Sequence, residues 1–257
     1  MTPSTGSTGD PHEPHDPGNP RNPGGPGGAA APEEPVLAVR AVSHAYARTP
    51  ALRQVSFSVH PGEVVAVTGP SGCGKSTLLH VAAGLLRPQA GEVRLLGQDL
   101  GPLDESQRAR LRRRHVGIVL QYGQLVPDMS LEDNVALPLL LDGAEAAAAR
   151  TAARDALARV GMEHAGAAVP QELSGGQAQR AAIARALITS PRLLLADEPI
   201  ASLDAVAGAD ALELLLGLAR SGGGAVVLVT HDNTAAAMAD REIRLRDGAV
   251  ERESVLR

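Results

Sequence analysis

Gly69-Pro70-Ser71-Gly72-Cys73-Gly74-Lys75-Ser76-Thr77 (GPSGCGKST, residues 69–77) is the stretch that decides the fold. It matches the pattern G-x-x-x-x-G-K-[ST], whose glycines let backbone N–H groups turn inward around phosphates. Its neighbours fit the pattern, because Val64–Thr68 is a nearly unbroken β-branched and apolar run and residues 75–83 favour a helix that stops at Gly84. The order of strand, loop and helix predicts an α/β fold with a phosphate-binding loop at a helix N-terminus.

The basic residues of the chain are 23 arginines and a single lysine, Lys75. A compact ammonium on a thin stem can enter a phosphate cradle that a planar guanidinium cannot. We therefore expect Lys75 to reach the β- and γ-phosphates of a nucleotide and the Ser76 hydroxyl to ligate Mg²⁺.

The one cysteine, Cys73, is expected to fill space in the loop. If its thiol faces the phosphates, the helix N-terminus and Lys75 favour the thiolate, and maleimide is expected to inactivate the protein. A thiol that faces the interior, and is inert, is the alternative.

The composition excludes several classes of protein. With 257 residues, 44% of them hydrophobic and 21% charged, the chain is long enough for one substantial α/β core. The longest stretch without Asp, Glu, Lys or Arg has 13 residues, His115–Pro127, which is too short to span a bilayer as a helix. A single cysteine forms no internal disulfide and the N-terminus lacks the apolar run of a signal peptide, so we expect a cytoplasmic protein.

The first 35 residues differ from the rest of the chain. They contain nine prolines, seven glycines, five acidic residues and one arginine, with no apolar periodicity before Val36. Such a composition cannot bury enough surface to offset the entropy of ordering, so residues 1–35 are predicted to be a disordered tail, either a solvated extension or a tether for a partner. The net charge of −5 lies mostly there, and the nearly neutral remainder argues against a surface that coats nucleic acid.

Apolar runs predict the other elements. Runs without polar alternation are typical of strands buried on both faces of a parallel sheet, and alanine-rich stretches favour helices. The expected strands are 36–40, 55–59, 64–68, 116–120, 193–196 and 225–230; the expected helices are 75–83, 144–160 and 176–188; and Asp247-Gly248 marks a hairpin.

Two further motifs carry chemistry. Leu173-Ser174-Gly175-Gly176-Gln177 begins a second helix, with Ser174 as its N-cap and Gln177 at the third helical position. Leu193-Leu194-Leu195-Ala196-Asp197-Glu198 ends a buried strand with two carboxylates. Because neighbouring side chains alternate across a strand, we expect Asp197 to join a magnesium shell and Glu198 to position and polarise an attacking water.

This set of motifs, in this order, resembles the ATP-binding-cassette (ABC) ATPases over about Val36–Val250. The resemblance implies ATP and Mg²⁺ as ligands. It also implies a P-loop core with a mostly parallel sheet, an antiparallel β subdomain, and a helical subdomain at about residues 122–180 that carries LSGGQ. The ABC ATPase domain is then expected to occupy residues 36–257.

The resemblance also implies roles for single residues. Tyr46 falls where the family stacks an aromatic ring on adenine, although a surface tyrosine is the alternative. Gln121 follows a strand where the family's glutamine touches magnesium and senses the transmembrane partner, Asp204 lies where a segment contacts the opposite subunit, and His231 matches the histidine that contacts the γ-phosphate. An exposed glutamine and a helix cap are the alternatives for Gln121 and Asp204. Ile200 departs from the pattern, because related chains have threonine in Asp-Glu-Pro-Thr.

The implied site needs two chains, because LSGGQ serves the nucleotide of the partner subunit. A homodimer or a pair of related ATPase subunits is therefore expected. Catalysis is expected from Lys75, Glu198 and His231 and metal binding from Ser76, Gln121 and Asp197; the nucleotide is expected to contact Tyr46, Gly69, Pro70, Ser71, Gly72, Cys73, Gly74, Lys75, Ser76, Thr77, Gln121, Ser174, Gly175, Gly176, Gln177, Asp197 and Asp204.

A separate integral membrane permease is the second expected partner, which would hold the subunit at the cytoplasmic face of the membrane. Residues 121–141 are expected to face it, and their sequence looks like the branch that contains the lipoprotein-releasing, macrolide-efflux and cell-division ATPases. An arginine-rich run lies just ahead, and it is expected to be a solvated face or, alternatively, a patch for anionic headgroups or the permease. The run consists of Arg108, Arg110, Arg112, Arg113 and Arg114.

Two other functions compete with this interpretation. A soluble ABC ATPase that acts on nucleic acid or ribosomes would carry a long coiled coil or two cassettes, but the chain has one cassette, no heptad run and no basic excess. No nucleic acid partner is therefore expected. A degenerate cassette that only binds nucleotide is disfavoured because Lys75, Glu198 and His231 are all present.

Overall fold

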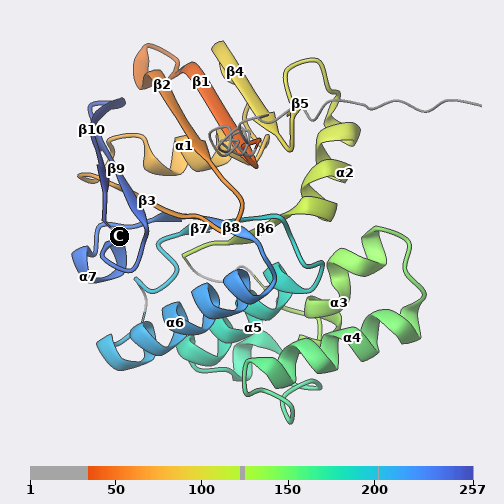
Figure 1. The fold of residues 1–257 in the computed structure, drawn as a ribbon. Helices are drawn as coiled ribbons and strands as arrows, with labels where there is room; N and C mark the ends of the chain where they lie inside the picture. The colour runs from red at the N-terminus through yellow and green to blue at the C-terminus, as the bar shows by residue number, and fades with distance from the viewer. Residues whose placement is uncertain (1–33, 122–124, 202, 257) are drawn as a thin grey trace, which may run out of the picture. The chain divides into compact units, whose positions relative to one another are not determined.

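The computed structural model describes residues 34–121, 125–201 and 203–256. The predicted tail therefore lies outside the described residues, apart from Glu34 and Pro35. Two sheets with helices between and below them form this part of the chain (Figure 1).

A six-stranded sheet has the order β10-β9-β3-β8-β7-β6. All neighbouring strands are parallel except the edge pair β9 and β10, which forms an antiparallel hairpin. The inner strands β3 and β8 are completely buried, which explains why their sequences show no polar alternation. The strands are β3 (Val64–Thr68), β6 (Val116–Val119), β7 (Leu193–Asp197), β8 (Ala225–Val229), β9 (Arg241–Arg246) and β10 (Ala249–Val255).

A four-stranded antiparallel sheet has the order β2-β1-β4-β5. Its strands are β1 (Leu37–Tyr46), β2 (Thr49–Val59), β4 (Ala90–Leu95) and β5 (Gln98–Asp99). Helix α1 (Lys75–Ala82) lies between this sheet and the six-stranded one and contacts strands of both (Figure 1). A hydrophobic cluster that includes Leu37, Leu78 and Val227 fills this layer.

The other face of the six-stranded sheet is covered by helices (Figure 1). A second hydrophobic cluster joins strands β3, β7 and β8 to α3, α4, α5 and α6. The helices are α2 (Glu105–His115), α3 (Leu131–Leu141), α4 (Ala146–Arg159), the 3₁₀ helix η1 (Pro170–Glu172), α5 (Gly175–Leu187), α6 (Ala205–Ser221) and the short α7 (Asn233–Ala236).

The predicted fold class is confirmed. The observed elements differ from the predicted ones in two ways. Strands β1 and β2 run to residues 46 and 49, beyond the expected strands, because they continue into a common hairpin. Elements α2, α3, α6, α7, β4 and β5 were not predicted. Within the described residues, no helix is both long and apolar enough to cross a membrane.

Candidate functional site

The candidate site lies at one edge of the six-stranded sheet. Strands β3, β8, β7 and β6 are parallel, so their carboxyl ends meet at this edge. The glycine-rich loop 69–74 follows β3, and Thr230 and His231 follow β8. Glu198 follows β7, and Leu120 and Gln121 follow β6. The topology thus brings together residues that are up to 162 positions apart in the sequence.

The loop 69–74 has a backbone that only glycine permits at its ends. Gly69 has φ +142° and Gly74 has φ +106°, both in the region that side chains avoid. A β-carbon on Gly69 would lie 2.2 Å from the carbonyl oxygen of Leu245, and one on Gly74 would lie 2.3 Å from that of Ala51. Strands β9 and β2 therefore lie close against the two ends of the loop, at Gly69 and Gly74.

Lys75 is buried and its ammonium lies over the loop. Its Nζ donates hydrogen bonds to the carbonyl oxygens of Gly69 at 2.8 Å and Pro70 at 3.1 Å. In this described segment, no side chain caps the N-terminus of α1 and its first turn contains no acidic residue. The helix therefore presents backbone N–H groups and a positive dipole end beside a cation, which is an arrangement suited to phosphate.

A cavity of about 280 Å³ adjoins this loop and helix N-terminus. Its walls come from the loop, from the start of α1 and from the hairpin that joins β1 and β2. Tyr46 lines it with a half-exposed ring, as a residue that stacks on a base must. The lining residues are Tyr46, Thr49, Pro50, Ala51, Gly72, Gly74, Lys75, Ser76 and Thr77. Sequence reasoning missed the contribution of Thr49, Pro50 and Ala51, which carry no motif.

Asp197 ends β7 at this edge of the sheet as a partly buried carboxyl group. Burial raises the pKa of the Asp197 carboxyl above its ordinary value, and a hydrogen bond with Ser76 partly opposes this. The neighbouring charge of Glu198 raises the pKa further, whereas His80 and Lys75 lower it. The buried Oδ1 atom of Asp197 has no hydrogen-bond partner among the described residues. A cation beside Asp197 and Ser76 would satisfy this oxygen and offset its burial, so the donor set fits Mg²⁺.

Glu198 and His231 form a pair. Oε1 of Glu198 lies 2.8 Å from Nδ1 of His231. The backbone of Glu198 has φ +47°, and its N–H donates to the carbonyl oxygen of Val229 at 2.9 Å. This strained conformation turns the chain directly after β7, so that the two adjacent carboxylates contact different groups: Asp197 meets Ser76 and Glu198 meets His231.

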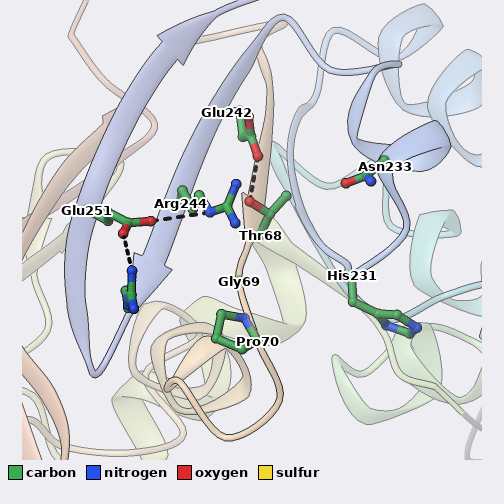
Figure 2. A pocket seen from close by; sticks show the side chains of 9 residues that line it. Thr68, Gly69, Pro70, His231, Asn233, Glu242, Arg244 and Glu251 are labelled. Carbon is green, nitrogen blue, oxygen red and sulfur yellow. Dashed lines mark hydrogen bonds and ion pairs between the residues drawn. The ribbon is translucent and has the colours of Figure 1, made fainter.

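A larger cavity, about 510 Å³, lies on the other side of the loop's first residues. Figure 2 shows Thr68 and the loop between the charged residues of the β9–β10 hairpin on one side and His231 and Asn233 on the other. The Thr68 hydroxyl donates to Glu242 at 2.6 Å, and Glu251 pairs with Arg244. Neither Lys75 nor Ser76 lines this cavity, so the smaller one is the better place for a nucleotide.

The second glycine motif lies elsewhere. Ser174 caps α5 as predicted, its Oγ accepting from the N–H of Gln177 at 3.3 Å while Gln177 Oε1 accepts from the N–H of Ser174. Among the described residues that line the two cavities, none belongs to 174–177. Asp204 caps α6, accepting from the N–H groups of Val206 and Ala207. Ser202, in the same predicted segment, lies outside the described residues.

Two local expectations are corrected by the structure. Cys73 is 6% exposed and belongs to the hydrophobic cluster between the sheets, so it fills space as expected, and the expectation of a thiol that faces the phosphates is wrong. The reason is the turn of the loop, which points Cys73 inward against Gly69.

The arginine run on α2 is also not a uniformly solvated face. Four of its five arginines form ion pairs within the chain, and Arg108 is buried. The pairs are Arg108–Glu105 at 2.6 Å, Arg112–Glu105 at 3.0 Å, Arg113–Asp142 at 3.2 Å and Arg114–Asp142 at 2.9 Å. Two carboxylates, Glu105 and Asp142, therefore neutralise part of the positive charge of α2 locally.

Known proteins share this sequence and this fold. A family model described as ABC transporter matches residues 52–201. The lipoprotein-releasing system ATP-binding protein LolD of Shewanella sp. (strain MR-4) is 43% identical over 220 residues, covering 84% of this chain and 95% of the relative. A protein of the same name from Chromohalobacter salexigens is 46% identical over 203 residues, covering 79% and 86%.

Solved structures give the same result. A dimeric ATP-binding cassette in a post-hydrolysis state, bound to ADP and Pi, has a TM-score of 0.80 at 36% identity and covers 86% of this chain and 99% of its own. CbiO1 from Clostridium perfringens, part of an ABC transporter complex, has a TM-score of 0.78 at 28% identity and covers 87% and 90%. The predicted resemblance is confirmed: this chain belongs to the ABC transporter family, as an ATP-binding and ATP-hydrolysing subunit.

Proposed function

We propose that the chain hydrolyses ATP at the sheet edge described above and couples this reaction to a separate membrane permease. The observation that carries the proposal is the convergence of Lys75, Ser76, Asp197, Glu198 and His231 on one edge of the sheet. A cation for phosphate, a metal-binding pair and a carboxylate held by a histidine are the parts that phosphoryl transfer to water requires.

We assign nucleotide binding to the glycine-rich loop 69–74 and the ammonium of Lys75. The backbone N–H groups of the loop and the N-terminus of α1 hold the phosphates, and Lys75 turns its ammonium from the loop carbonyls to the β- and γ-phosphates. Tyr46 stacks on the adenine base. Ser76, Asp197 and Gln121 hold Mg²⁺, which neutralises charge on the phosphate oxygens when bound.

Hydrolysis needs a water held in line with the γ-phosphate. Glu198 is suited to this, because an ionised carboxylate accepts a hydrogen bond from the water and polarises it. The bond to His231 fixes the direction of this carboxylate. Since an ionised carboxylate only accepts, His231 donates through Nδ1. For Nε2 to donate to a γ-phosphate oxygen as well, both ring nitrogens must carry a proton.

A second copy completes the site. Residues 174–177 begin α5 with free backbone N–H groups at Gly175 and Gly176, which suits them to phosphate, yet they line no cavity around Lys75. We propose that they contact the nucleotide of a partner subunit, with Asp204 at the same junction. ATP then joins two copies head to tail, and hydrolysis lets them part.

The permease docks on the side of the sheet that ends in β6. A groove of about 390 Å³ lies there between α2, β6, α3 and α5, with apolar residues such as Leu137 and Leu141 and the basic residues Arg112, Arg113 and Arg185. The relatives named for lipoprotein release favour a permease of the export or extrusion type. Docking there holds the subunit at the cytoplasmic face of the membrane.

Glu198→Gln tests the proposed hydrolysis. The variant keeps the shape of the side chain and loses the charge that polarises water, so ATP turnover is expected to fall roughly 10²-fold or more while ATP still binds. Because binding without hydrolysis keeps the copies joined, gel filtration with Mg²⁺ and ATP is expected to show a dimer. Glu213→Gln, at an exposed position of α6, is the matched control and should behave like the wild type. Near-normal turnover in Glu198→Gln, or loss of ATP binding, would contradict the assignment.

A further inference from the structure

The end of β1 is held by a side chain where its neighbouring strand stops. The ladder between β1 and β4 ends at the pair Ser43 and Ala90. Beyond it, Gln89 continues the pairing with its own amide: Oε1 accepts from the N–H of Ala45 at 2.9 Å, and Nε2 donates to the carbonyl oxygen of Ala45 at 3.2 Å. The backbone N–H of Gln89 also donates to the carbonyl oxygen of Ser43 at 2.9 Å. A primary amide offers one donor and one acceptor side by side, as a peptide group does, so Gln89 acts as an additional strand residue.

His44 supports the same strand end from the side-chain face. It is 8% exposed, and its ring centroid lies 5.0 Å from that of Tyr46 at an interplanar angle of 77°. This is the edge-to-face geometry that aromatic pairs favour. The Nδ1 atom of His44 is buried and has no hydrogen-bond partner among the described residues, so hydrogen bonding at that atom does not account for a histidine here.

Tyr46 itself has few other supports. It is the last residue of β1, opposite Thr49 in the hairpin, and Ala47 after it has φ +53°. Tyr46 is 51% exposed. A tyrosine at a hairpin tip would sample several rotamers, and each binding event would then have to select the productive one.

We propose that Gln89 and His44 are positioning residues that set the Tyr46 ring for stacking on the base of ATP. Gln89 fixes the backbone between His44 and Tyr46, and the edge-on contact of His44 fixes the ring. The inference rests on the proposed adenine contact of Tyr46. It adds that residues outside the family motifs tune the affinity for the base without contributing to the binding of the triphosphate.

The experiment measures KM for ATP, kcat and inhibition by tripolyphosphate, which has the phosphates but no base. Tyr46→Ala is the reference against which the other variants are compared. Its loss of stacking is expected to raise KM for ATP about 5- to 100-fold. Gln89→Ala and His44→Ala are each expected to raise KM about three- to tenfold, because the productive ring position becomes less populated. In all three, kcat and the inhibition constant of tripolyphosphate should stay within about twofold of the wild type.

Three further variants separate positioning from general damage. His44→Phe keeps the aromatic contact and is expected to restore KM to the wild-type value. Gln98→Ala, at another exposed glutamine of the same sheet, is the matched control for Gln89→Ala. Combining Gln89→Ala with Tyr46→Ala should raise KM no further than Tyr46→Ala alone, because the ring that Gln89 positions is gone.

The outcomes are distinct. If Tyr46→Ala leaves KM unchanged, the adenine contact of the proposed function is wrong and the inference falls with it. If Tyr46→Ala weakens binding but Gln89→Ala and His44→Ala do not, the positioning role alone is overturned. A parallel loss of tripolyphosphate inhibition would also overturn it, because it would show that the substitutions disturb the loop.

Discussion

The Cys73 thiol is buried against Gly69, and this burial should control its reactivity. A β-carbon on Gly69 would lie 2.8 Å from Sγ, which shows how closely the loop folds over the sulfur. Maleimide needs an accessible thiolate, so labelling of the native protein has to wait for the loop to open.

We therefore predict that native Cys73 is labelled roughly 10²-fold or more slowly than the same residue in urea-unfolded protein. Mass spectrometry after timed labelling measures both rates. Full labelling of the folded protein within the time that the unfolded chain requires would contradict the burial of the thiol.

Single residues with motifs could be predicted from the sequence, and residues without motifs could not. Lys75, Asp197 and Glu198 are recognisable because spacing and strand ends fix their chemistry. His44 and Gln89 carry no such signal. The contact of Gln89 with Ala45 spans 44 residues of sequence, and the ring contact of His44 with Tyr46 is local but belongs to no motif. The direction of Cys73 also escaped prediction, since it depends on how tightly β9 approaches the loop.

At the scale of elements, one partly buried ion pair joins the turn before β3 to the start of β9. Arg241 Nε lies 2.7 Å from Glu63 Oε1, and Arg241 also pairs with Glu253. Burial alone would raise the pKa of Glu63, but the hydrogen bond and charge of Arg241, with the N–H of His60, hold it below its ordinary value. A carboxyl with a lowered folded-state pKa stabilises the fold above its unfolded pKa, and this stabilisation is lost as the pH falls through the folded-state value.

Glu63→Gln is accordingly expected to lower the free energy of unfolding by about 1–3 kcal/mol at pH 7, because Arg241 loses one of its two charged partners and keeps only Glu253. The difference from the wild type should shrink once the pH falls below the ordinary pKa of a glutamate, because the wild-type stabilisation is lost between that value and the lower folded-state pKa of Glu63. Urea unfolding at several pH values measures it, with the exposed Glu163→Gln as control. A difference that stays constant down to pH 3 would show that charge is not the cause.

Helices and strands could be predicted where burial produced a clear pattern of apolar residues in the sequence. Strands β3, β7 and β8 are buried apolar runs and were found, whereas α2 was not, because it is rich in arginine and has only one buried residue, Arg108. Its capping box, Asp104 with Gln107, was the available signal. Helix α3 was also missed, since Pro138 lies inside it.

At the scale of the whole molecule, the two glycine motifs belong to different parts of the chain. Lys75 begins α1 between the sheets, and Ser174 caps α5 on the opposite face of the six-stranded sheet (Figure 1). Each nucleotide is therefore proposed to lie between the loop of one copy and LSGGQ of another. The sequence could indicate this arrangement only through family resemblance, because no local pattern shows which surface a second copy covers.

Mixing two inactive variants tests this central claim most directly. Lys75→Ala damages the loop of every copy, and Ser174→Arg damages LSGGQ; each variant alone should hydrolyse ATP at no more than about 1% of the wild-type rate. In a mixed dimer, the loop of the Ser174→Arg copy meets the intact LSGGQ of the Lys75→Ala copy, which rebuilds one complete site. We therefore expect an equimolar mixture of the two folded variants to hydrolyse ATP well above the sum of their separate rates; a mixture no more active than that sum would show that the two motifs do not meet across a pair of copies.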